Sequence, residues 1–345
     1  MRKHIINCRQ HLGTALQMLN DLGEDLTLFV VNDEEQLIGT LTDGDSRRGL
    51  LNGLGISDCV VKFMKDEYRF ITYNNYEVKE VAEAKRIGVK ILPVVDEKKR
   101  IVRLINFSQY KSYLPLSAVI MAGGDGIRLR PLTENLPKPL LIIGDKPIIE
   151  FGIDWLIQYG IEDFNISINY LGDKIASYFG DGSAKNISIS YIKEKNRSGT
   201  IGSVSLIEEM KHDNILVLNA DLLTNFDLEE FYNRHKNANA DMSIACIPYN
   251  VNIPYAILDT DQDNVLSLKE KPTITYHSNA GIYLIKKEHL NRIPKHQFFN
   301  ATDLIDNLIE DAKKVIYYPI LGYWLDIGKM DDFKKAQEDI KFIKF

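Results

Sequence analysis

The stretch Ala118–Glu150 constrains the fold more than any other part of this chain. It begins with a five-residue apolar run, Ala118–Ala122, which is too short for a buried helix and is followed by glycines. Such a run predicts a buried strand of a parallel sheet. Gly123, Gly124 and Gly126 come next, and glycines there let the backbone turn sharply and bring its N–H groups close to a ligand.

Basic side chains follow this turn. Arg128 and Arg130 come first, and Lys138 then lies between Pro137 and Pro139. Guanidinium and ammonium groups on a glycine-rich turn are suited to a polyphosphate. An ordinary strand and turn with basic surface residues is the alternative. The segment is not a Walker A loop, because no Gly-Lys-Ser/Thr follows, and it lacks the GxGxxG spacing of a dinucleotide-binding turn.

The full string AGGDGIRLRPLTENLPKPL, residues 122–140, resembles the signature of the sugar-1-phosphate nucleotidyltransferases, GGxGTRLxPLTxxxPKPL. This resemblance implies an α/β fold with a Rossmann-like, mostly parallel sheet. It also implies that Arg128 neutralises the leaving β- and γ-phosphates and that Lys138 holds the reacting phosphates. Ile127 stands where the family usually has Thr, which removes one hydroxyl from the site. The nucleotide would be bound by the turn residues Ala122, Gly123, Gly124 and Gly126.

Length and composition limit the class of protein. A chain of 345 residues predicts two domains, and 45% apolar with 26% charged residues is typical of a soluble globular protein. The net charge of -6 argues against a nucleic-acid partner. Cys8, Cys59 and Cys246 form no metal-ligand pattern and fit reduced thiols. The N-terminal residues lack the apolar core of a signal peptide, and no apolar run approaches the ~20 residues of a membrane span. We therefore expect a cytoplasmic protein with no membrane partner.

Residues 1–113 contain a duplication. Leu28–Thr42 aligns with Leu92–Asn106, 64 positions further on, and each copy reads as a strand, a polar turn and a strand. Two such units are expected to bury their apolar faces against one another. A helical stretch precedes each copy and ends at a candidate C-cap glycine: Thr14–Leu22 before Gly23, and Val78–Ile87 before Gly88.

This duplication resembles a pair of cystathionine-β-synthase (CBS) modules, or Bateman module, most clearly in the sequence GTLTDGDSRR at residues 39–48. The resemblance implies that Thr42 and Asp45 hold the phosphate and ribose of an adenosine nucleotide. A carboxylate suits a ribose diol because it accepts two hydrogen bonds. Asn106 and Gln109 replace them in the second copy, so we expect at most one well-formed site. A purely structural role, with the pair joining copies into a homo-oligomer, is an equal alternative.

We divide the chain into a tandem CBS module at 1–113, a linker at 114–116, where Pro115 stops any preceding helix, and a nucleotidyltransferase domain at 117–345. In the last part, apolar runs alternate with helical patterns, which predicts ligands at the carboxyl ends of parallel strands. The expected strands are Asp163–Asn169, Ile187–Ile192, Ile215–Asn219, Met242–Ile247 and Gly281–Ile285. The expected helices are Pro147–Tyr159, Gly202–Met210 and Leu228–Lys236, the last opened by a capping box of Asp227 and Glu230.

The segment from Lys193 to Gly202 resembles the family's base-recognition segment, with Gly199 and Thr200 in its turn. A carboxylate at Glu194 can accept two hydrogen bonds from the N1–H and 2-amino groups of guanine. That favours GTP over UTP or dTTP, whose bases offer one N–H on that edge. A solvated surface glutamate is the alternative.

Two aspartates are candidate metal ligands. Asp221 ends a buried strand, and Asp326 lies in the sequence GYWLDIG at residues 322–328. The family resemblance implies that they jointly hold Mg²⁺ against the nucleotide phosphates, and carboxylates suit such a hard cation. Either residue alone would more simply be a helix cap or a turn aspartate.

The sugar side rests on four segments. Glu270-Lys271-Pro272 resembles the family's EKP, in which Glu contacts sugar hydroxyls and Lys the sugar phosphate. Asn279 and Gly281 lie in an NAGIY sequence that approaches the hexose in the family. The remaining candidates are Tyr255, followed by Ala256 where the family has Gly, and Asp303, either a helix cap or a partner for a sugar amino group.

The resemblance implies attack of a sugar-1-phosphate oxygen on the α-phosphorus of an NTP. Such catalysis rests on positioning and charge stabilisation, with Lys271 on the attacking phosphate. A CBS pair ahead of such a domain resembles guanylyltransferases of bacterial surface-sugar pathways, so we expect GTP and a hexose-1-phosphate, first of all glucosamine-1-phosphate. Mannose-1-phosphate, or UTP or dTTP, is the alternative within the class. A nucleotide-sensing regulatory protein with an inert transferase domain is the alternative outside it.

Overall fold

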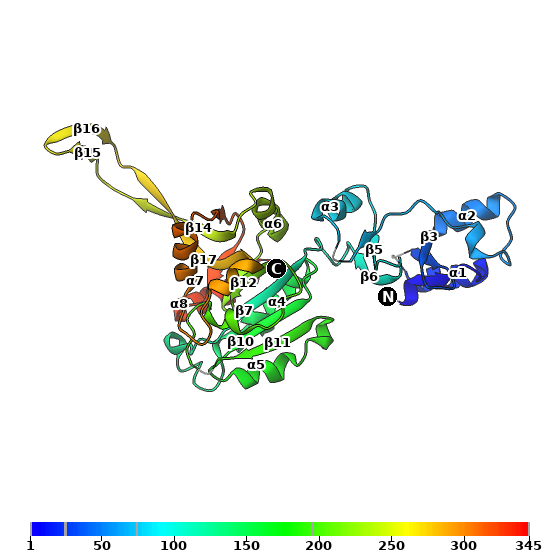
Figure 1. Ribbon diagram of the computed structural model, residues 1–345, viewed down its shortest axis with the longest axis horizontal. Helices are drawn as coiled ribbons and strands as arrows, with labels where there is room; N and C mark the ends of the chain where they lie inside the picture. Colours follow the sequence, from blue (N-terminus) through cyan, green and yellow to red (C-terminus); the bar gives the residue numbers. More distant parts are fainter. Residues whose placement is uncertain (1, 24–25, 74, 195, 344–345) are drawn as a thin grey trace. The chain divides into compact units, whose positions relative to one another are not determined.

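The computed structural model of the chain describes residues 2–23, 26–73, 75–194 and 196–343. It divides the chain into two compact units, Met1–Tyr113 and Leu114–Phe345 (Figure 1). The expected linker residues belong to the second unit, because Leu114 and Leu116 are buried and the Leu114 N–H donates to the carbonyl of Tyr159 at 2.8 Å. Among the described residues, no helix is long and apolar enough to cross a membrane.

The first unit repeats one small sheet. The first copy consists of β1 (Ile5–Asn7), β2 (Thr27–Val31) and β3 (Leu37–Thr42), and the second of β4 (Ile71–Thr72), β5 (Ile91–Val95) and β6 (Ile101–Asn106). Leu28 lies opposite Leu41 in the first copy, and Leu92 lies opposite Ile105 in the second. All the remaining pairs between β2 and β3 recur 64 positions later between β5 and β6, and so does the one register shift. The predicted duplication is confirmed in the backbone pairing.

The helices of this unit show where the copies differ. The expected helices form as α1 (Leu12–Asp21) and α3 (Val78–Arg86), and the glycines after them adopt the positive φ of a C-cap. After β3 the chain forms α2 (Asp43–Leu51), whereas the described residues after β6 form turns. There the Asn106 side chain accepts hydrogen bonds from the N–H and hydroxyl of Ser108. Two short 3₁₀ helices complete the unit, η1 (Arg2–His4) and η2 (Val60–Lys62).

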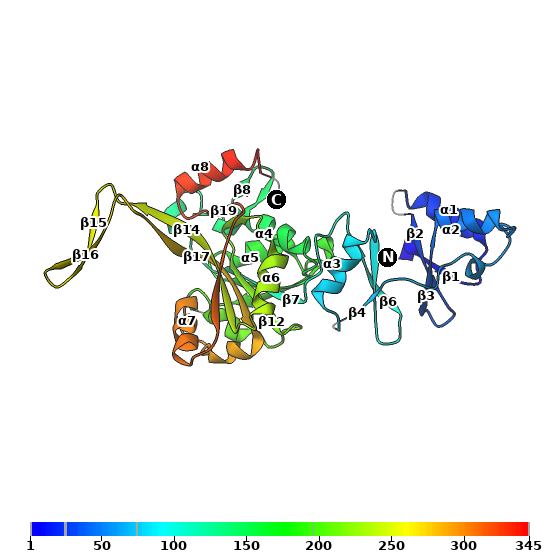
Figure 2. The same cartoon turned by 90° about the horizontal axis from the view of Figure 1, so that it is seen from above.

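The second unit is built on a seven-stranded sheet with the order β11-β10-β7-β12-β17-β14-β18 (Figure 2). All neighbouring strands are parallel except where β17 pairs with β12 and β14, so the predicted mostly parallel α/β sheet is confirmed. The strands are β7 (Leu116–Ala122), β10 (Asp163–Ile168), β11 (Ser188–Lys193), β12 (Asn214–Asn219), β14 (Met242–Asn252), β17 (Thr273–Lys286) and β18 (Val315–Pro319).

Helices cover this sheet. Leu304 and Leu308 of one of them, α7 (Ala301–Glu310), pack against Val119 and Val217 of the central strands. The others are α4 (Ile148–Ile157), α5 (Gly172–Phe179), α6 (Leu228–Asn237) and α8 (Met330–Asp339). Shorter elements are β8 (Ile142–Ile143), β9 (Lys146–Pro147), β13 (Leu222–Thr224), β15 (Ile257–Asp261), β16 (Asn264–Lys269), β19 (Trp324–Asp326), η3 (Ile127–Leu129), η4 (Lys138–Leu140), η5 (Ser183–Lys185), η6 (Gly202–Leu206) and η7 (Lys287–Arg292).

Two details differ from the sequence predictions. The expected helix Gly202–Met210 is only a short 3₁₀ turn, η6, in which the Ser205 hydroxyl bonds to the carbonyl of Gly202. Serine side chains compete in this way with helical bonding of the backbone. Asp227 caps α6 as predicted, accepting from the N–H groups of Glu229 and Glu230. The carboxylate of Glu230, however, accepts the hydroxyl of Tyr318 at 2.9 Å.

A buried histidine makes the stability of this unit sensitive to pH. Burial of His235, with Lys236 and Lys286 nearby, lowers its pKa from 6.5 to about 4. Its Nδ1 lies 2.7 Å from the Ser243 hydroxyl, and its Nε2 lies 3.2 Å from the Asn214 side-chain oxygen. The imidazole therefore stays neutral in the folded chain below pH 6.5, where the unfolded chain takes up a proton.

We expect the free energy of unfolding to fall as the pH drops from 6.5 towards 4, by up to about 3 kcal/mol from this residue. Urea unfolding followed by circular dichroism at several pH values measures the slope. His235→Gln should flatten the slope in this window, whatever it does to the stability at neutral pH. An equal slope in both proteins would contradict the assignment.

Candidate active site

The carboxyl ends of β7 and β12 open into a cavity of about 690 Å³. β7 leads into the glycine-rich turn, and β12 leads into Asp221. The structure brings the predicted nucleotide residues together here with Arg128, Lys138 and Asp221, although they come from three separate stretches, 122–138, 194–200 and 221. These cavity residues are Ala122, Gly123, Gly124, Gly126, Arg128, Lys138, Glu194, Gly199, Thr200 and Asp221.

Gly126 shapes the turn. Its φ of 64° is left-handed, and a Cβ there would lie 3.0 Å from the side chain of Thr133 and 3.1 Å from that of Lys138. Only glycine meets both conditions without strain. η3 follows directly and carries Arg128 on the cavity wall, next to Ile127, whose side chain is exposed there in place of the family's threonine.

Two aspartates that are far apart in the sequence lie side by side. β13 and β19 pair so that Leu222 is opposite Asp326, and the Ile327 N–H donates to the carbonyl of Asp221 at 3.0 Å. Lys138 forms an ion pair with Oδ2 of Asp221. Burial raises the pKa of Asp326, and the charge of the neighbouring Asp221 raises it further.

One oxygen of each carboxylate is left over. Oδ1 of Asp221 and Oδ1 of Asp326 are buried and have no hydrogen-bond partner within the described part of the chain. Buried acceptors without a partner are costly, and two adjacent carboxylate oxygens are ligands that a hard divalent cation prefers. The donor set at this point therefore fits Mg²⁺.

Glu194 is held at the wall of the cavity. Its Oε1 accepts the Ser167 hydroxyl at 2.5 Å, and its Oε2 accepts the Ser198 N–H at 3.2 Å. A Cβ on Gly123 would lie 2.8 Å from Oε1, so the turn and this carboxylate are in close contact. Glu194 is thus a fixed group in the cavity, and the alternative of a freely solvated surface glutamate is wrong.

A second cavity of about 390 Å³ adjoins the first and shares Thr200, Asn219 and Asn300 with it. Asn279 lines it and is held by the Tyr283 hydroxyl at 2.7 Å and the Gly281 N–H at 2.9 Å. Polar amide groups and an indole around a small cavity are suited to a polyol. Its other walls include Gly281, Trp324 and Asp326.

Gly281 has no room for a side chain. Its φ is 71°, and a Cβ there would lie 2.5 Å from the side-chain nitrogen of Asn219. The backbone of β17 can therefore approach the shared wall of the two cavities closely.

The family model described as Nucleotidyl transferase matches residues 117–342. The chain belongs to this family. It is 30% identical over 241 residues to a UTP–glucose-1-phosphate uridylyltransferase from Synechocystis, covering 64% of this chain and 62% of the relative. It is also 30% identical to a D-glycero-alpha-D-manno-heptose 1-phosphate guanylyltransferase from Aneurinibacillus thermoaerophilus, covering 66% of this chain and 99% of the relative.

A mannose-1-phosphate guanylyltransferase from Mycobacterium tuberculosis is 29% identical, and 64% of its length is matched. The chain thus spans less than two thirds of the uridylyltransferase and of this relative. The crystal structure of HddC from Yersinia pseudotuberculosis is 26% identical, with a TM-score of 0.51, covering 65% of this chain and 99% of that one.

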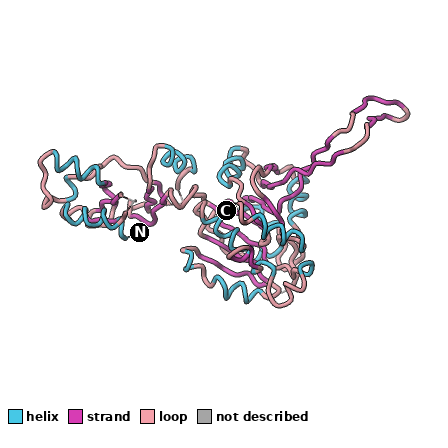
Figure 3. Tube along the Cα trace, turned by 180° about the vertical axis from the view of Figure 1, so that it is seen from behind, coloured by secondary structure: helices cyan, strands magenta, loops and turns pink. Residues whose placement is uncertain are grey.

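Three predicted sugar residues of the nucleotidyl transferase unit lie away from both cavities. Tyr255, Glu270 and Lys271 are on a hairpin formed by residues 248–277, which we call the arm (Figures 1 and 3). Among the described residues that line the two cavities, none belongs to the arm. The β14–β17 ladder continues outward from Asn279 to Thr273, which is about 20 Å along a strand. The structure therefore places them outside both cavities, and their role as sugar ligands stays a prediction.

Asp303 also has a different role. Its Oδ2 accepts the N–H of Asn300 at 2.7 Å, at the start of α7, and it is not among the described lining residues of either cavity. A carboxylate at the third position of a helix points back to the N-terminus in this way. The helix-cap alternative is confirmed, and a contact with a sugar amino group stays a prediction.

Sequence reasoning missed four wall residues of the transferase: Arg197, Asn219, Asn300 and Trp324. Asn219 and Trp324 lie two residues before Asp221 and Asp326, so the quoted strings already contained them. The other two had no signal. Asn300 reaches the site because its side-chain oxygen accepts the Thr200 N–H at 3.1 Å, and Arg197 forms an ion pair with Asp125.

The first unit has its own cavity of about 1020 Å³, lined by Thr42 and Asp45 as well as by Lys65. Asp45 Oδ2 accepts the N–H and hydroxyl of Thr42, and Oδ1 is paired with Arg48 and Lys65. Burial alone would raise the pKa of Asp45, but Thr42, Arg48 and Lys65 lower it. This carboxylate caps α2, so a ribose would have to displace a basic side chain to reach it.

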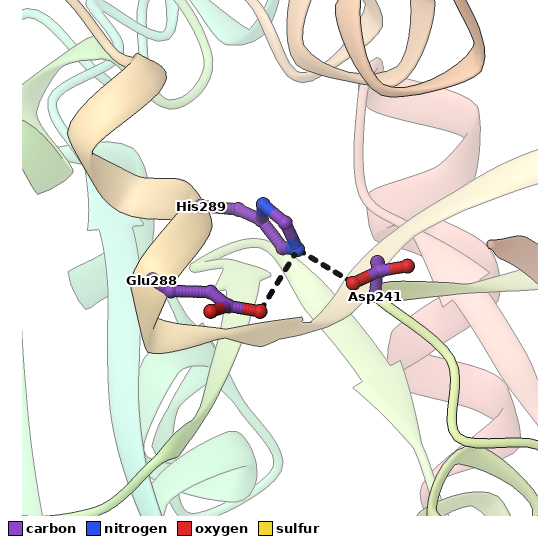
Figure 4. A group of neighbouring side chains, drawn as sticks. All are labelled: Asp241, Glu288 and His289. Carbon is purple, nitrogen blue, oxygen red and sulfur yellow. Dashed lines mark hydrogen bonds and ion pairs between the residues drawn. The ribbon is translucent and has the colours of Figure 1, made fainter. Parts of the chain in front are cut away.

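Asp241, Glu288 and His289 also lie together, with ligand atoms close enough for a metal (Figure 4). His289 Nε2 is 2.8 Å from Oδ1 of Asp241, and the Lys314 N–H donates to Oδ2 at 2.8 Å. Burial alone would raise the pKa of Asp241, but the Lys314 N–H, the His289 side chain and the charge of Lys286 together lower it to about 2. Both carboxylate oxygens of Asp241 already have hydrogen-bond partners, so this cluster joins η7 and the chain segments before β14 and β18 structurally.

Proposed function

We propose that the chain transfers a nucleoside monophosphate from an NTP to a hexose-1-phosphate and releases pyrophosphate. One observation carries this proposal. A glycine-rich turn, Arg128, Lys138 and Asp221 line one cavity. Asp326, whose buried Oδ1 has no partner among the described residues, lines the smaller polar cavity that adjoins it. The family membership supports the same class of reaction.

The chemistry needs no protein nucleophile. An oxygen of the hexose-1-phosphate forms a bond to the α-phosphorus, and the bond from that phosphorus to the pyrophosphate oxygen breaks. Arg128 is placed to neutralise the β- and γ-phosphates, and Lys138 to hold the reacting phosphates. We propose that Asp221 and Asp326 hold Mg²⁺, which would supply positive charge to the nucleotide oxygens when bound. The backbone N–H groups of the turn orient the triphosphate.

We propose GTP as the nucleotide and glucosamine-1-phosphate as the sugar, giving GDP-glucosamine for legionaminic acid or related surface-glycan synthesis. The fixed carboxylate of Glu194 supports guanine, because Ser167 and Ser198 hold it while each oxygen keeps a further lone pair. Guanylyltransferases among the relatives support the same choice. Mannose-1-phosphate, or UTP or dTTP with another hexose phosphate, is the alternative, and one relative is a uridylyltransferase.

Replacing Glu194 by Gln tests the base. Glutamine keeps one acceptor oxygen but turns the other into a donor, which faces a donor of guanine. We expect kcat/KM for GTP to fall about 10- to 100-fold, with a much smaller change for UTP. Steady-state kinetics with both nucleotides measures the ratio, and Glu310→Gln, on the exposed side of α7, is the matched control. An equal loss for both nucleotides would remove the guanine assignment.

The deciding experiment measures pyrophosphate release with GTP, UTP, dTTP, CTP and ATP. Each is paired with glucosamine-1-phosphate, N-acetylglucosamine-1-phosphate, mannose-1-phosphate and glucose-1-phosphate. The highest kcat/KM with GTP and glucosamine-1-phosphate is the expected result. Turnover with another pair would keep the reaction class and replace the substrate. No turnover with any pair would favour a regulatory protein with an inert transferase unit.

For the first unit we propose a CBS pair that binds an adenosine nucleotide or joins copies of the chain. The duplication and the cavity lined by Thr42 and Lys65 support a ligand, because Lys65, Arg69 and Lys90 offer a phosphate three basic groups. The same lining carries four carboxylates, those of Asp43, Asp45, Asp66 and Glu67. Equilibrium dialysis with AMP and ATP tests this proposal separately from catalysis. Binding that is unchanged in Lys65→Ala would place the nucleotide elsewhere.

A further inference from the structure

One aromatic ring lines the larger cavity of the transferase unit. Among the described residues that line this cavity, Phe298 is the only aromatic one. It lies in the short segment before α7, and it is 64% exposed. A phenyl ring carries a large apolar area with two flat faces, which a ligand with a flat face of its own can cover. The ring is therefore a candidate contact for a planar group.

The next residue shows that this exposure is specific to Phe298. Phe299 is half-buried and packs against the core cluster that contains Ile201 and Leu304. Two consecutive phenylalanines thus have different surroundings, because one ring helps to fill the core and the other lines the cavity. The core anchors the segment at Phe299 and leaves the ring of Phe298 for a ligand.

The segment that carries Phe298 is attached to the segment that carries Glu194. The Phe299 N–H donates to the carbonyl of Ser198 at 3.0 Å, and the Ile201 N–H donates to the carbonyl of Phe299 at 3.2 Å. The Ser198 N–H in turn donates to Oε2 of Glu194 at 3.2 Å. Ser198 therefore links the carboxylate at the cavity wall to the backbone beside the exposed ring.

Two glycines make this close approach possible. A Cβ on Gly199 would lie 2.5 Å from the carbonyl oxygen of Phe299, and a Cβ on Gly202 would lie 2.9 Å from that of Gln297. Both carbonyls are backbone groups that cannot swing aside as a side chain can. The two segments can therefore meet along residues 198–202 only because these positions lack side chains.

A nucleobase offers a polar edge and two flat apolar faces. The carboxylate of Glu194 can accept hydrogen bonds from the edge, but it cannot cover a face. An aromatic side chain covers a face by stacking, and it does so for any base because every base has a flat π-surface. A carboxylate and a ring that are held on two joined segments supply both kinds of contact.

We infer that Phe298 stacks on the face of the nucleobase whose edge Glu194 binds. This inference deepens the proposed function and rests on it for the identity of the ligand. The two side chains divide the recognition of the nucleotide. Stacking on Phe298 supplies affinity for any base, with more contact area for a purine, whereas Glu194 distinguishes guanine from the other bases.

Direct titration of nucleotides in the absence of a sugar phosphate tests the contact without turnover. Phe298→Ala should raise the Kd of GTP about tenfold and that of UTP by a smaller factor. The Kd of inorganic tripolyphosphate, which has no base, should not change. Phe298→Tyr keeps the ring and should keep the wild-type Kd values. Phe342→Ala, at a position that is 87% exposed and lines neither cavity, is the matched control.

Steady-state kinetics separate base binding from a purely structural role. Phe298→Ala should raise KM for GTP about tenfold and change kcat less than about twofold, because stacking holds the ground state and the transition state equally. The Tm should stay at the wild-type value, since the ring is exposed. Glu194→Gln should weaken GTP selectively, whereas Phe298→Ala should weaken both GTP and UTP.

The outcomes of the titration decide the inference. Unchanged Kd values for GTP and UTP in Phe298→Ala would overturn it, and so would an equal loss for tripolyphosphate. A wild-type chain that binds neither nucleotide would overturn it as well. If no substrate pair is turned over but Phe298→Ala weakens the binding of nucleotides and not of tripolyphosphate, the proposed transfer fails and the contact with the base stands.

Discussion

Asp326→Asn is expected to lower kcat/KM for nucleotidyl transfer by about 10³-fold or more. The substitution keeps the shape of the side chain but removes one of two buried carboxylate oxygens that have no partner within the described residues. Pyrophosphate release over a range of Mg²⁺ concentrations measures the loss. Asp306→Asn, an exposed position on α7, is the matched control and should retain the wild-type rate.

Thermal unfolding provides a second test of the role of Asp326. Burial raises the pKa of Asp326, and repulsion by the charge of Asp221 raises it further. In buffer with a chelator, Asp326→Asn should therefore unfold at the same or a higher temperature than the wild type. Added Mg²⁺ should raise the Tm of the wild type more than that of the variant. A variant that keeps its activity, or the full Mg²⁺ effect on Tm, would remove Asp326 from the metal site.

Lys138→Met should cost about 10²- to 10³-fold in kcat, the usual effect of removing one charge aimed at a transition state. The residue is 9% exposed, its ammonium group is paired with Asp221, and its β-carbon lies beside Gly126, so water cannot replace the ammonium group freely. Methionine fills similar volume and isolates the loss of charge. Stopped-flow or steady-state assays with saturating substrates measure kcat.

The control for this variant is Lys334→Met, on the exposed part of α8. It should keep the wild-type kcat and KM. A Lys138→Met protein with an unchanged kcat and a raised KM would show that the lysine binds substrate uniformly and does not act in the transition state.

The sequence predicted the parts of this protein whose pattern is local. The glycine-rich turn after β7, the parallel sheet and the duplication each depend on residues within one short window or one fixed repeat. The backbone pairs of β2 with β3 and of β5 with β6 then follow from the repeat. The nucleotide cavity followed as well, because parallel strands end at a common edge.

The features that the sequence could not place depend on long-range geometry. The closeness of Asp221 and Asp326 is set by the pairing of β13 with β19, and only the family resemblance linked them beforehand. The position of the arm residues, away from both cavities, depends on the length of a strand ladder, which no short sequence pattern gives. The expected helix Gly202–Met210 does not form as predicted. The spacing of apolar residues does not reveal that the Ser205 hydroxyl bonds to the backbone carbonyl of Gly202.

Trp324 gives the transferase unit a built-in optical signal. The chain has two tryptophans, and Trp155 is fully buried against Phe226, away from solvent and ligand. Trp324 lines the smaller of the two cavities, which we propose for the sugar, and its indole N–H donates to the carbonyl of Ala280 at 3.0 Å. A hexose phosphate entering that cavity changes the polarity around this indole alone, so its fluorescence emission can follow sugar binding without label or turnover.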